Sequence, residues 1–198
     1  SILFALIIPV FSISQITRGT SINFIDDEDK KQGKWVVNFE NSQAIRYSGQ
    51  FLDDKPIGTF LYYYPSGEES ANMQFTDEKN SYAKMYHKNG FLIATGKYYE
   101  RKKDSVWWYF NNHKEVIRKE YYERGIQTGE QITYYPSDPS KERMKIFEIQ
   151  YYNNGVKHGK EEHFYESGRI KLQGNFLDGY QDGKIKYFFP SGNLEIEG

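Results

Sequence analysis

The side chains best suited to metal binding or acid–base catalysis are four histidines and 27 acidic residues. The histidines are His87, His113, His158 and His163, and only the last two lie close together in the sequence. A turn is expected between them, and no carboxylate is expected to be positioned to complete a set of metal ligands with them. The acidic residues recur along the chain without forming a distinctive pair of the kind that glycosidases use. The sequence therefore predicts no metal site and no acid–base pair.

Other catalytic arrangements are missing as well. The chain has no Cys, which excludes disulfides and thiolate metal ligands. Its glycines separate short aromatic segments and open no expected helix, so they do not form a phosphate-binding loop. Its serines are turn residues, without the strand–turn–helix context of a nucleophile elbow. We therefore expect a protein that is not an enzyme, with no catalytic residue and no cofactor.

Rows of aromatic side chains are the remaining candidates for binding. In the expected strands that precede each turn, aromatic residues occupy both faces. Rings that point away from the core in rows are typical of a surface that binds sugars or peptides. The alternative is structural, because loops or a partner domain could cover these rings. The candidate binding face consists of Tyr62, Tyr64, Trp108, Phe110, Tyr135, Tyr165, Tyr187 and Phe189.

The aromatic residues, 18% of the chain, also align in two columns that reveal a repeat. Relative to the turn residues Gln43, Gly67, Gly90, His113, Asp138, Gly168 and Gly192, the position four residues earlier is always aromatic. This first column is Phe39, Tyr63, Tyr86, Tyr109, Tyr134, Phe164 and Phe188. The second column is Phe51, Phe75, Tyr98, Tyr121, Tyr151 and Phe176. The repeat is about 24 residues long, and both columns are predicted to face the core.

Turn chemistry and residue alternation define each repeat as a β-hairpin. Pro65, Ser66 and Gly67 suit a tight turn at the hairpin tip, and the Pro-rich segment 136–145 lengthens one tip. Behind the tips, apolar and polar residues alternate with period two, and glycines such as Gly96 fall on the inner face under a neighbouring ring. We predict an all-β fold: tandem hairpins in an elongated, twisted, single-layer antiparallel meander of about 13 strands.

The segment Gly159 to Gly198 resembles tandem MORN-repeat variants of the YwqK type. Gly159, Phe164, Gly168, Ile170, Gly174, Phe176, Gly179 and Gly183 fill that family's pattern in order. The similarity covers about Gly33 to Gly198 and is weaker in the third and fourth repeats, where Ser81, Ser105 and Lys119 occupy glycine positions. The resemblance implies a non-catalytic array of β-hairpins used for interaction or scaffolding. Many bacterial members are labelled antitoxins of toxin–antitoxin systems.

The sequence suggests how the chain divides into a signal segment, a linker and a repeat array. Residues 1–14 resemble the end of a clipped signal peptide, because Ile2 to Phe11 is an uncharged apolar run and Ser12 and Ser14 suit cleavage before Gln15. A buried first strand is the alternative for this run. Residues 15–32 are expected to be a linker and 33–198 the repeat array, which we expect to continue beyond Gly198. A cleaved signal would place the protein outside the bacterial cytoplasm, and otherwise it would be cytoplasmic.

Overall charge limits the classes of partner. The chain carries 26 basic and 27 acidic residues, so nucleic acid and anionic membrane surfaces are not favoured. We expect a protein-interaction or scaffold module with a protein partner. An antitoxin-like protein that neutralises a toxin is one alternative, and a module that binds carbohydrate or cell wall through the aromatic face is another.

Overall fold

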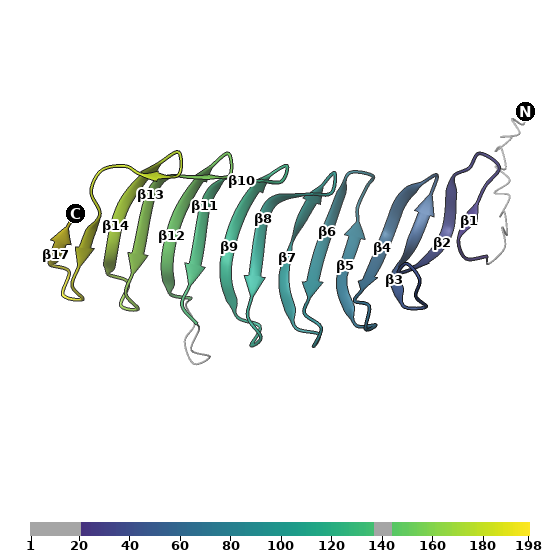
Figure 1. The fold of residues 1–198 in the computed structure, drawn as a ribbon, viewed down its shortest axis with the longest axis horizontal. Coiled ribbons are helices and arrows are strands. Elements are labelled where there is room, and N and C mark those ends of the chain that lie inside the picture. Colours follow the sequence, from purple (N-terminus) through teal and green to yellow (C-terminus); the bar gives the residue numbers. More distant parts are fainter. Residues whose placement is uncertain (1–20, 137–143) are drawn as a thin grey trace, which may run out of the picture.

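A computed structural model describes residues 21–136 and 144–198, which form one open antiparallel sheet (Figure 1). Each strand pairs with its neighbours in sequence, so the chain runs as successive hairpins from one end of the sheet to the other. The predicted all-β meander is confirmed. Its strands are β1 (Phe24–Ile25), β2 (Lys31–Asn38), β3 (Ile45–Leu52), β4 (Lys55–Tyr63), β5 (Glu69–Phe75), β6 (Asn80–Tyr86), β7 (Leu92–Tyr99), β8 (Lys102–Phe110), β9 (Val116–Glu123), β10 (Ile126–Gln127), β11 (Gly129–Tyr134), β12 (Ile146–Asn153), β13 (Val156–Phe164), β14 (Ile170–Leu177), β15 (Tyr180–Gln181), β16 (Lys186–Phe188) and β17 (Leu194–Glu197).

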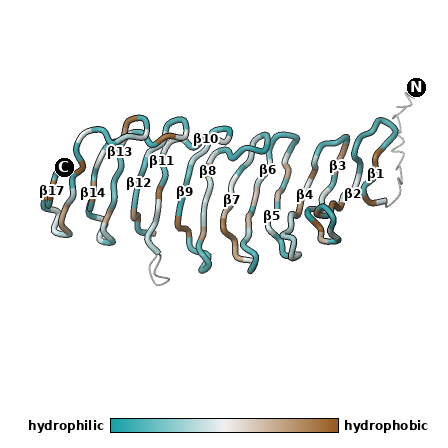
Figure 2. Tube along the Cα trace, viewed as in Figure 1, coloured by the Kyte–Doolittle hydropathy of each residue, from teal (hydrophilic) through white to brown (hydrophobic). Residues whose placement is uncertain are grey.

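Seven hairpins make up the repeat: β2–β3, β4–β5, β6–β7, β8–β9, β11–β12, β13–β14 and β16–β17. The predicted linker at 15–32 contains β1, which pairs with the start of β2. The predicted signal segment, 1–14, lies outside the described residues. None of the described segments is a helix able to span a bilayer. Hydrophilic residues occupy many of the turns, and hydrophobic ones are interspersed along the strands (Figure 2).

Five of the described hairpin tips share one geometry. The carbonyl oxygen of Tyr64 accepts a hydrogen bond of 2.9 Å from the amide of Gly67, which has a φ of 102°. In β8–β9 the equivalent amide is that of Lys114, with a φ of 65°, which donates to Asn111. The predicted tip residue His113 was therefore wrong by one position. Because the reference residue of the fourth repeat changes by one position, the residues of this repeat that align with the two aromatic columns change as well.

The tip of β2–β3 differs from these five. There the Ser42 amide donates to the Phe39 carbonyl, and Asn41 has the positive φ. The predicted tip residue Gln43 was therefore wrong by one position.

At most of the described turns between repeats, the chain passes through a pair of residues with positive φ, and the turn between β5 and β6 is an exception. Arg124–Gly125 and Asp178–Gly179 are such pairs, with φ values between 48° and 92°. Two successive positive φ angles define the type I′ turn that matches the twist of an antiparallel hairpin. A further positive φ occurs at or just before the start of several strands, at Gly129 and Gly183 for example, and Ser105 adopts it in β8. This explains the recurring G-x-x-x-G pattern.

Most of the buried core lies on one face of the sheet, which we call the inner face; buried Ile132 pairs with Lys119 on the opposite face. The central column of the inner face occupies the position seven residues before each tip: Trp35, Phe60, Ala83 and Trp107, of which Trp107 is fully buried. The predicted first column, which included Tyr63 and Tyr109, does not coincide with this position, although Tyr109 packs against the buried cluster around Trp107 as predicted. The cause is a shift of strand register near each tip, such as that between Tyr62 and Tyr63, which sequence alternation alone does not reveal.

Glycines on the partner strands make room for these rings, as predicted. A Cβ added to Gly49 would lie 2.4 Å from the Phe60 ring, and one added to Gly96 would lie 2.4 Å from the Trp107 ring. Phe51 and Phe75 of the second column pack edge-on against Phe60, with centroids 5.1 and 5.2 Å apart. The sheet therefore stabilises its inner face by lateral contacts between neighbouring strands.

Two members of the second column were assigned wrongly. In the fourth repeat Tyr122 packs against the buried cluster around Trp107, whereas Tyr121 contacts Lys119 on the opposite face, which we call the outer face. In the fifth repeat Tyr152 hydrogen-bonds inner-face Gln150, and Tyr151 is 37% exposed. The first error follows from the displaced tip residue of β8–β9. The predicted reference residue of the fifth repeat, Asp138 in the Pro-rich tip, lies outside the described residues.

Candidate functional site

The predicted candidate binding residues do not form one row. Tyr62 lies on the inner face, with its ring centroid 5.8 Å from that of Tyr47. Trp108 lies on the outer face, with the Lys119 ammonium 5.7 Å from its ring centroid. Phe110 pairs with Val116 beside the tip of β8–β9. Tyr187, 39% exposed, and Phe189, 46% exposed, lie at the last hairpin.

Three of the predicted residues connect consecutive repeats. The hydroxyl groups of Tyr64, Tyr135 and Tyr165 donate hydrogen bonds of 2.8, 2.7 and 2.7 Å to backbone carbonyls in the next hairpin. Their acceptors are the carbonyls of Tyr86, Phe164 and Phe188. These contacts give the three tyrosines a structural role.

A hollow of about 380 Å³ opens on the inner face between β4 and β7. It exists because the central column carries Ala83 in the third repeat, between the large rings of Phe60 and Trp107 in the flanking repeats. Ala71 also lines the hollow. Small side chains at two neighbouring positions leave space that a ring fills elsewhere in the sheet.

The walls of this inner-face hollow are aromatic and thioether side chains. Tyr62, Tyr64 and Tyr98 contribute rings, and Met73 and Met85 contribute flexible chains. Burial raises the pKa of both Tyr62 and Tyr98. The hollow is therefore an apolar cleft in which phenol groups stay protonated at neutral pH.

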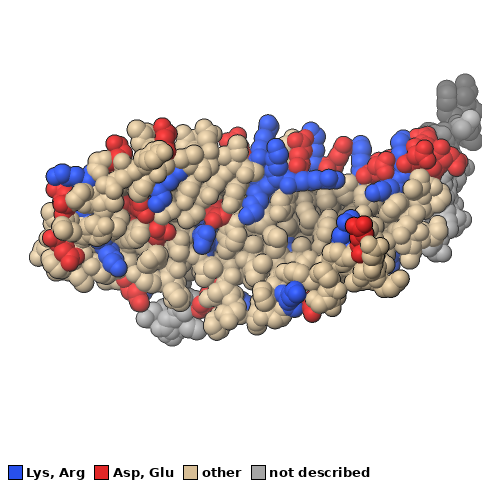
Figure 3. All heavy atoms as spheres, viewed as in Figure 1, with Lys and Arg blue, Asp and Glu red and all other residues tan. Residues whose placement is uncertain are grey.

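A charged rim borders the inner-face hollow. An adjoining depression of about 850 Å³ shares Tyr62, Met73 and Tyr98 with the hollow and reaches the turns between repeats. Charged residues of both signs line its edge, and Lys79 pairs with Glu100 at 2.8 Å. Charged side chains gather along this edge of the molecule in Figure 3, above a wide uncharged area. Charged residues of both signs therefore border the apolar surface, with no excess of positive or negative charge.

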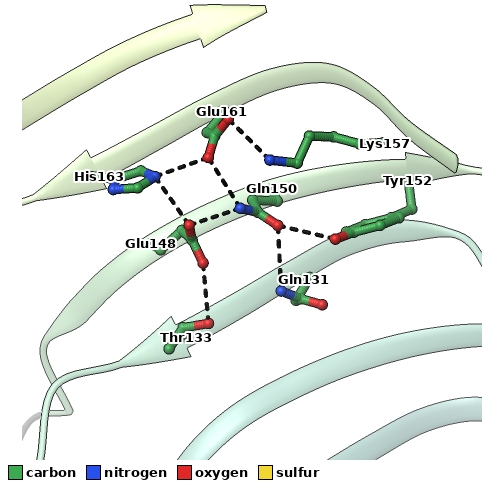
Figure 4. Close-up of polar contacts among 8 residues, drawn as sticks. All are labelled: Gln131, Thr133, Glu148, Gln150, Tyr152, Lys157, Glu161 and His163. Atoms are coloured by element: carbon green, nitrogen blue, oxygen red, sulfur yellow. Dashed lines mark hydrogen bonds and ion pairs between the residues drawn. The ribbon is translucent and has the colours of Figure 1, made fainter. Parts of the chain in front are cut away.

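The inner face changes character in the second half of the sheet. The central column continues as Gln131 in β11 and Glu161 in β13, and its partners in β9 and β12 include Glu120 and Gln150. Eight residues of β11, β12 and β13 form a hydrogen-bonded network (Figure 4). Buried carboxylates are costly unless they are paired, so such a network must be satisfied by its own members.

Two carboxylates converge on one imidazole in this polar network. His163 Nε2 lies 3.0 Å from Glu148 Oε1 and 2.9 Å from Glu161 Oε1. The Gln150 amide donates to the same two oxygens, at 2.7 and 3.0 Å. Among the described residues, Glu148, Glu161 and His163 form one group whose possible ligand atoms all lie within 4.8 Å of one another.

Electrostatics in this group follow from the hydrogen bonds. The bond with Glu148 raises the pKa of His163, against the opposing effect of burial. Burial acts to raise the pKa of Glu161, but hydrogen bonds from His163 and Lys157 outweigh it and lower the pKa. The Glu161 carboxylate is therefore ionised at neutral pH.

Sequence reasoning missed this convergence. It compared His163 with His158, whereas the nearby carboxylates come from the same strand two residues earlier and from the strand alongside. The pairing of Glu148 with His163 depends on the β12–β13 register. Extending the period-two alternation to charged residues would have placed Glu161 and His163 on one face. The position of Glu148 required the corrected register.

Comparisons with known proteins identify no family for the chain. No protein-family model matches it, and no curated protein matches it. A crystal structure of TarM is 12% identical, with a TM-score of 0.29, over 73% of this chain and 21% of that one. A mutant of S. aureus TarM, in complex with fondaparinux, alpha-GlcNAc-glycerol and UDP, is 12% identical with a TM-score of 0.26, over 68% of this chain and 20% of that one. The chain thus spans about a fifth of these structures, and similarity this low supports no argument about function.

Proposed function

We propose that this protein is a non-catalytic module that binds a protein partner through the inner-face hollow between β4 and β7. The observation that carries the proposal is the set of side chains lining the hollow, which combines tyrosine rings, two methionines and an alanine floor. Tyr and Met are enriched at protein interfaces, and the centres of such interfaces are depleted of charge. The charged rim, with its paired Lys79 and Glu100, matches the polar edge of such an interface.

The chemistry of the hollow favours a protein over a sugar. A carbohydrate site needs several polar groups that hydrogen-bond the sugar hydroxyls, in addition to flat rings. Here Ser70 and the tyrosine hydroxyls are the polar side-chain groups of the lining, and the Tyr64 hydroxyl already donates to Tyr86. Met73 and Met85 can adapt to irregular apolar side chains. Exposed aromatic or aliphatic side chains of a partner are therefore the best-fitting occupants.

Selection from a random peptide library displayed on phage tests this proposal. The protein is immobilised, and enriched peptides are synthesised and measured by fluorescence anisotropy. We expect peptides rich in aromatic and aliphatic residues. Ala71→Phe, which fills the hollow, and Met85→Glu, which places a charge in it, should each weaken binding at least about tenfold. Trp108→Ser alters the outer face and should leave the affinity unchanged.

Three outcomes would contradict the proposal. The first is that no peptide is enriched, the second is that the hollow variants bind as wild type does, and the third is that only Trp108→Ser loses binding. Circular dichroism of each variant establishes that the sheet is intact. An oligosaccharide array tested in parallel covers the carbohydrate alternative, which would replace the protein partner if the array showed binding that Ala71→Phe abolished.

A further inference from the structure

We propose that Glu148, Glu161 and His163 form a Zn²⁺ site on the inner face of β12 and β13. The first argument is position. Glu161 occupies the central column, where earlier repeats carry Phe60 or Trp107, and its residue is 92% buried. Ionised groups at such positions lower stability unless a counter-charge meets them. Lys157 supplies one positive charge against the two carboxylates Glu148 and Glu161, so a cation at this place in the fifth and sixth repeats would balance the remaining negative charge.

The second argument is geometric. In tetrahedral sites Zn²⁺ lies about 2.0–2.2 Å from nitrogen and oxygen ligands, which places those ligands roughly 3.3 Å apart. His163 Nε2 is already 2.9 and 3.0 Å from the two carboxylate oxygens. The two carboxylate oxygens lie within 4.8 Å of each other, so all three possible ligand atoms are close enough to converge on one ion. His163 presents Nε2 to both carboxylates, and its ring lies 5.7 Å from the Phe147 ring.

The third argument concerns the outer oxygens of the carboxylates. Lys157 Nζ binds Glu161 Oε2 at 3.1 Å, and Thr133 Oγ1 donates to Glu148 Oε2 at 3.4 Å. Each carboxylate is thus held through one oxygen and directs the other toward His163 (Figure 4). Outer contacts of this kind orient the ligands of metal sites.

Charge and ligand type indicate which ion would bind. With a neutral imidazole, the two carboxylates and Lys157 sum to a net charge of −1, which a divalent cation reverses. Imidazole ligands favour Zn²⁺ over Mg²⁺ and Ca²⁺, which prefer oxygen ligands alone. The bound ion replaces the amide contacts of Gln150, whose amide group turns to present its oxygen. Water occupies the remaining coordination position.

The ion would join β12 to β13 where the apolar column is interrupted. Glu148 belongs to β12, and Glu161 and His163 belong to β13. The site is separate from the inner-face hollow between β4 and β7, so this inference does not depend on the proposed protein-binding function. Its effect is expected in the stability of these repeats.

Metal titration of the full chain tests the site. Co²⁺ is the spectroscopic probe, and we expect one equivalent to give the visible absorption of a tetrahedral ion that Zn²⁺ then displaces. Isothermal titration with Zn²⁺ should show Glu148→Gln and His163→Gln weakening the affinity at least about tenfold. His158→Gln is the matched control, because His158 lies in the same strand and faces Asp178, outside the group. Its affinity should equal that of wild type.

A readout on the unmodified protein keeps the proposal falsifiable if a variant fails to fold. In nitrogen-15 spectra, Zn²⁺ should shift the ring nitrogens of one of the four histidines and leave the other three in place. The proposal is overturned if wild type shows no saturable Zn²⁺ binding, if Mg²⁺ binds as tightly, or if His158→Gln loses binding while His163→Gln keeps it.

Discussion

Trp107 and Trp108 are neighbours in β8 that lie on opposite faces of the sheet. Trp107 is fully buried, and its indole nitrogen donates a 3.0 Å hydrogen bond to the carbonyl of Lys97. We expect Trp107→Ala to lower the free energy of unfolding by about 3–5 kcal/mol, as large aromatic truncations in cores do. Trp108→Ala should cost less than about 1.5 kcal/mol. Urea denaturation compares the two, and equal losses would refute the assignment of the inner face.

Tyr122 gives the inner face a dependence on alkaline pH. Burial, followed by its 2.7 Å hydrogen bond to Glu120, raises the pKa of Tyr122 from 10.0 to about 12. The folded state therefore holds the phenol proton more tightly than the unfolded state. The resulting stability is fully present below pH 10 and is lost as pH rises toward about 12.

The free energy of unfolding, measured by urea denaturation from pH 9 to about 12, tests this dependence. Tyr122→Phe removes the titrating group, so the free energy of unfolding should fall less steeply with pH in this variant than in wild type. Tyrosines that do not interact with Tyr122 contribute equally to both proteins, so the difference between the two curves reports Tyr122 together with its neighbour Tyr109. Parallel curves would show that Tyr122 titrates normally in the folded protein.

At the scale of the hairpin, tyrosine hydroxyls connect neighbouring repeats. Tyr64→Phe, Tyr135→Phe and Tyr165→Phe each remove a hydrogen bond to a backbone carbonyl and keep the ring. We expect a loss of about 0.5–1.5 kcal/mol for each variant. Tyr82→Phe is the control, since Tyr82 is 57% exposed. Unfolding free energies indistinguishable from the control would mean that these hydroxyls do not hold the repeats together.

The tip of β8–β9 uses a residue that is poorly suited to its conformation. Lys114 has a φ of 65°, where the other described tips of this type carry glycine. Asn111 compensates by accepting backbone hydrogen bonds from His113 and Glu115 through its side chain. We expect Lys114→Gly to stabilise the protein by about 0.5–1 kcal/mol and Gly90→Lys to destabilise it similarly. A melting temperature that falls in Lys114→Gly would contradict this account of the tip.

The same tip shows how far the sequence could predict the fold. The repeat, the hairpins and the inner-face glycines followed from periodicity, because strand alternation and turn chemistry are local. The register near the tips did not, since the shift between Tyr109 and Phe110 depends on pairing between strands. The apolar hollow depends on the pairing of Ala83 with Met73 and of Ala71 with Met85 across β5 and β6. The polar network depends on the pairing of Glu148 with His163.

The whole molecule is a nearly one-dimensional assembly. Each hairpin contacts mainly its neighbours, so stability is distributed along the sheet instead of residing in one central core. Large rings fill the inner face over β2–β4 and again at β8, the hollow lies between them, and charged and amide groups follow toward β13. We infer that the repeats have specialised, with an apolar binding surface in the first half and a polar cluster in the second.

Methyl spectra of methionine test the proposed binding surface most directly. The chain has three methionines: Met73 and Met85 line the inner-face hollow, and Met144 is 48% exposed beside the tip of β11–β12. With carbon-13 methyl labels, titration with a selected peptide should shift the signals of Met73 and Met85 and leave that of Met144 unchanged. If Met144 alone shifts, or if no methionine signal responds to saturating peptide, the hollow is not the binding surface.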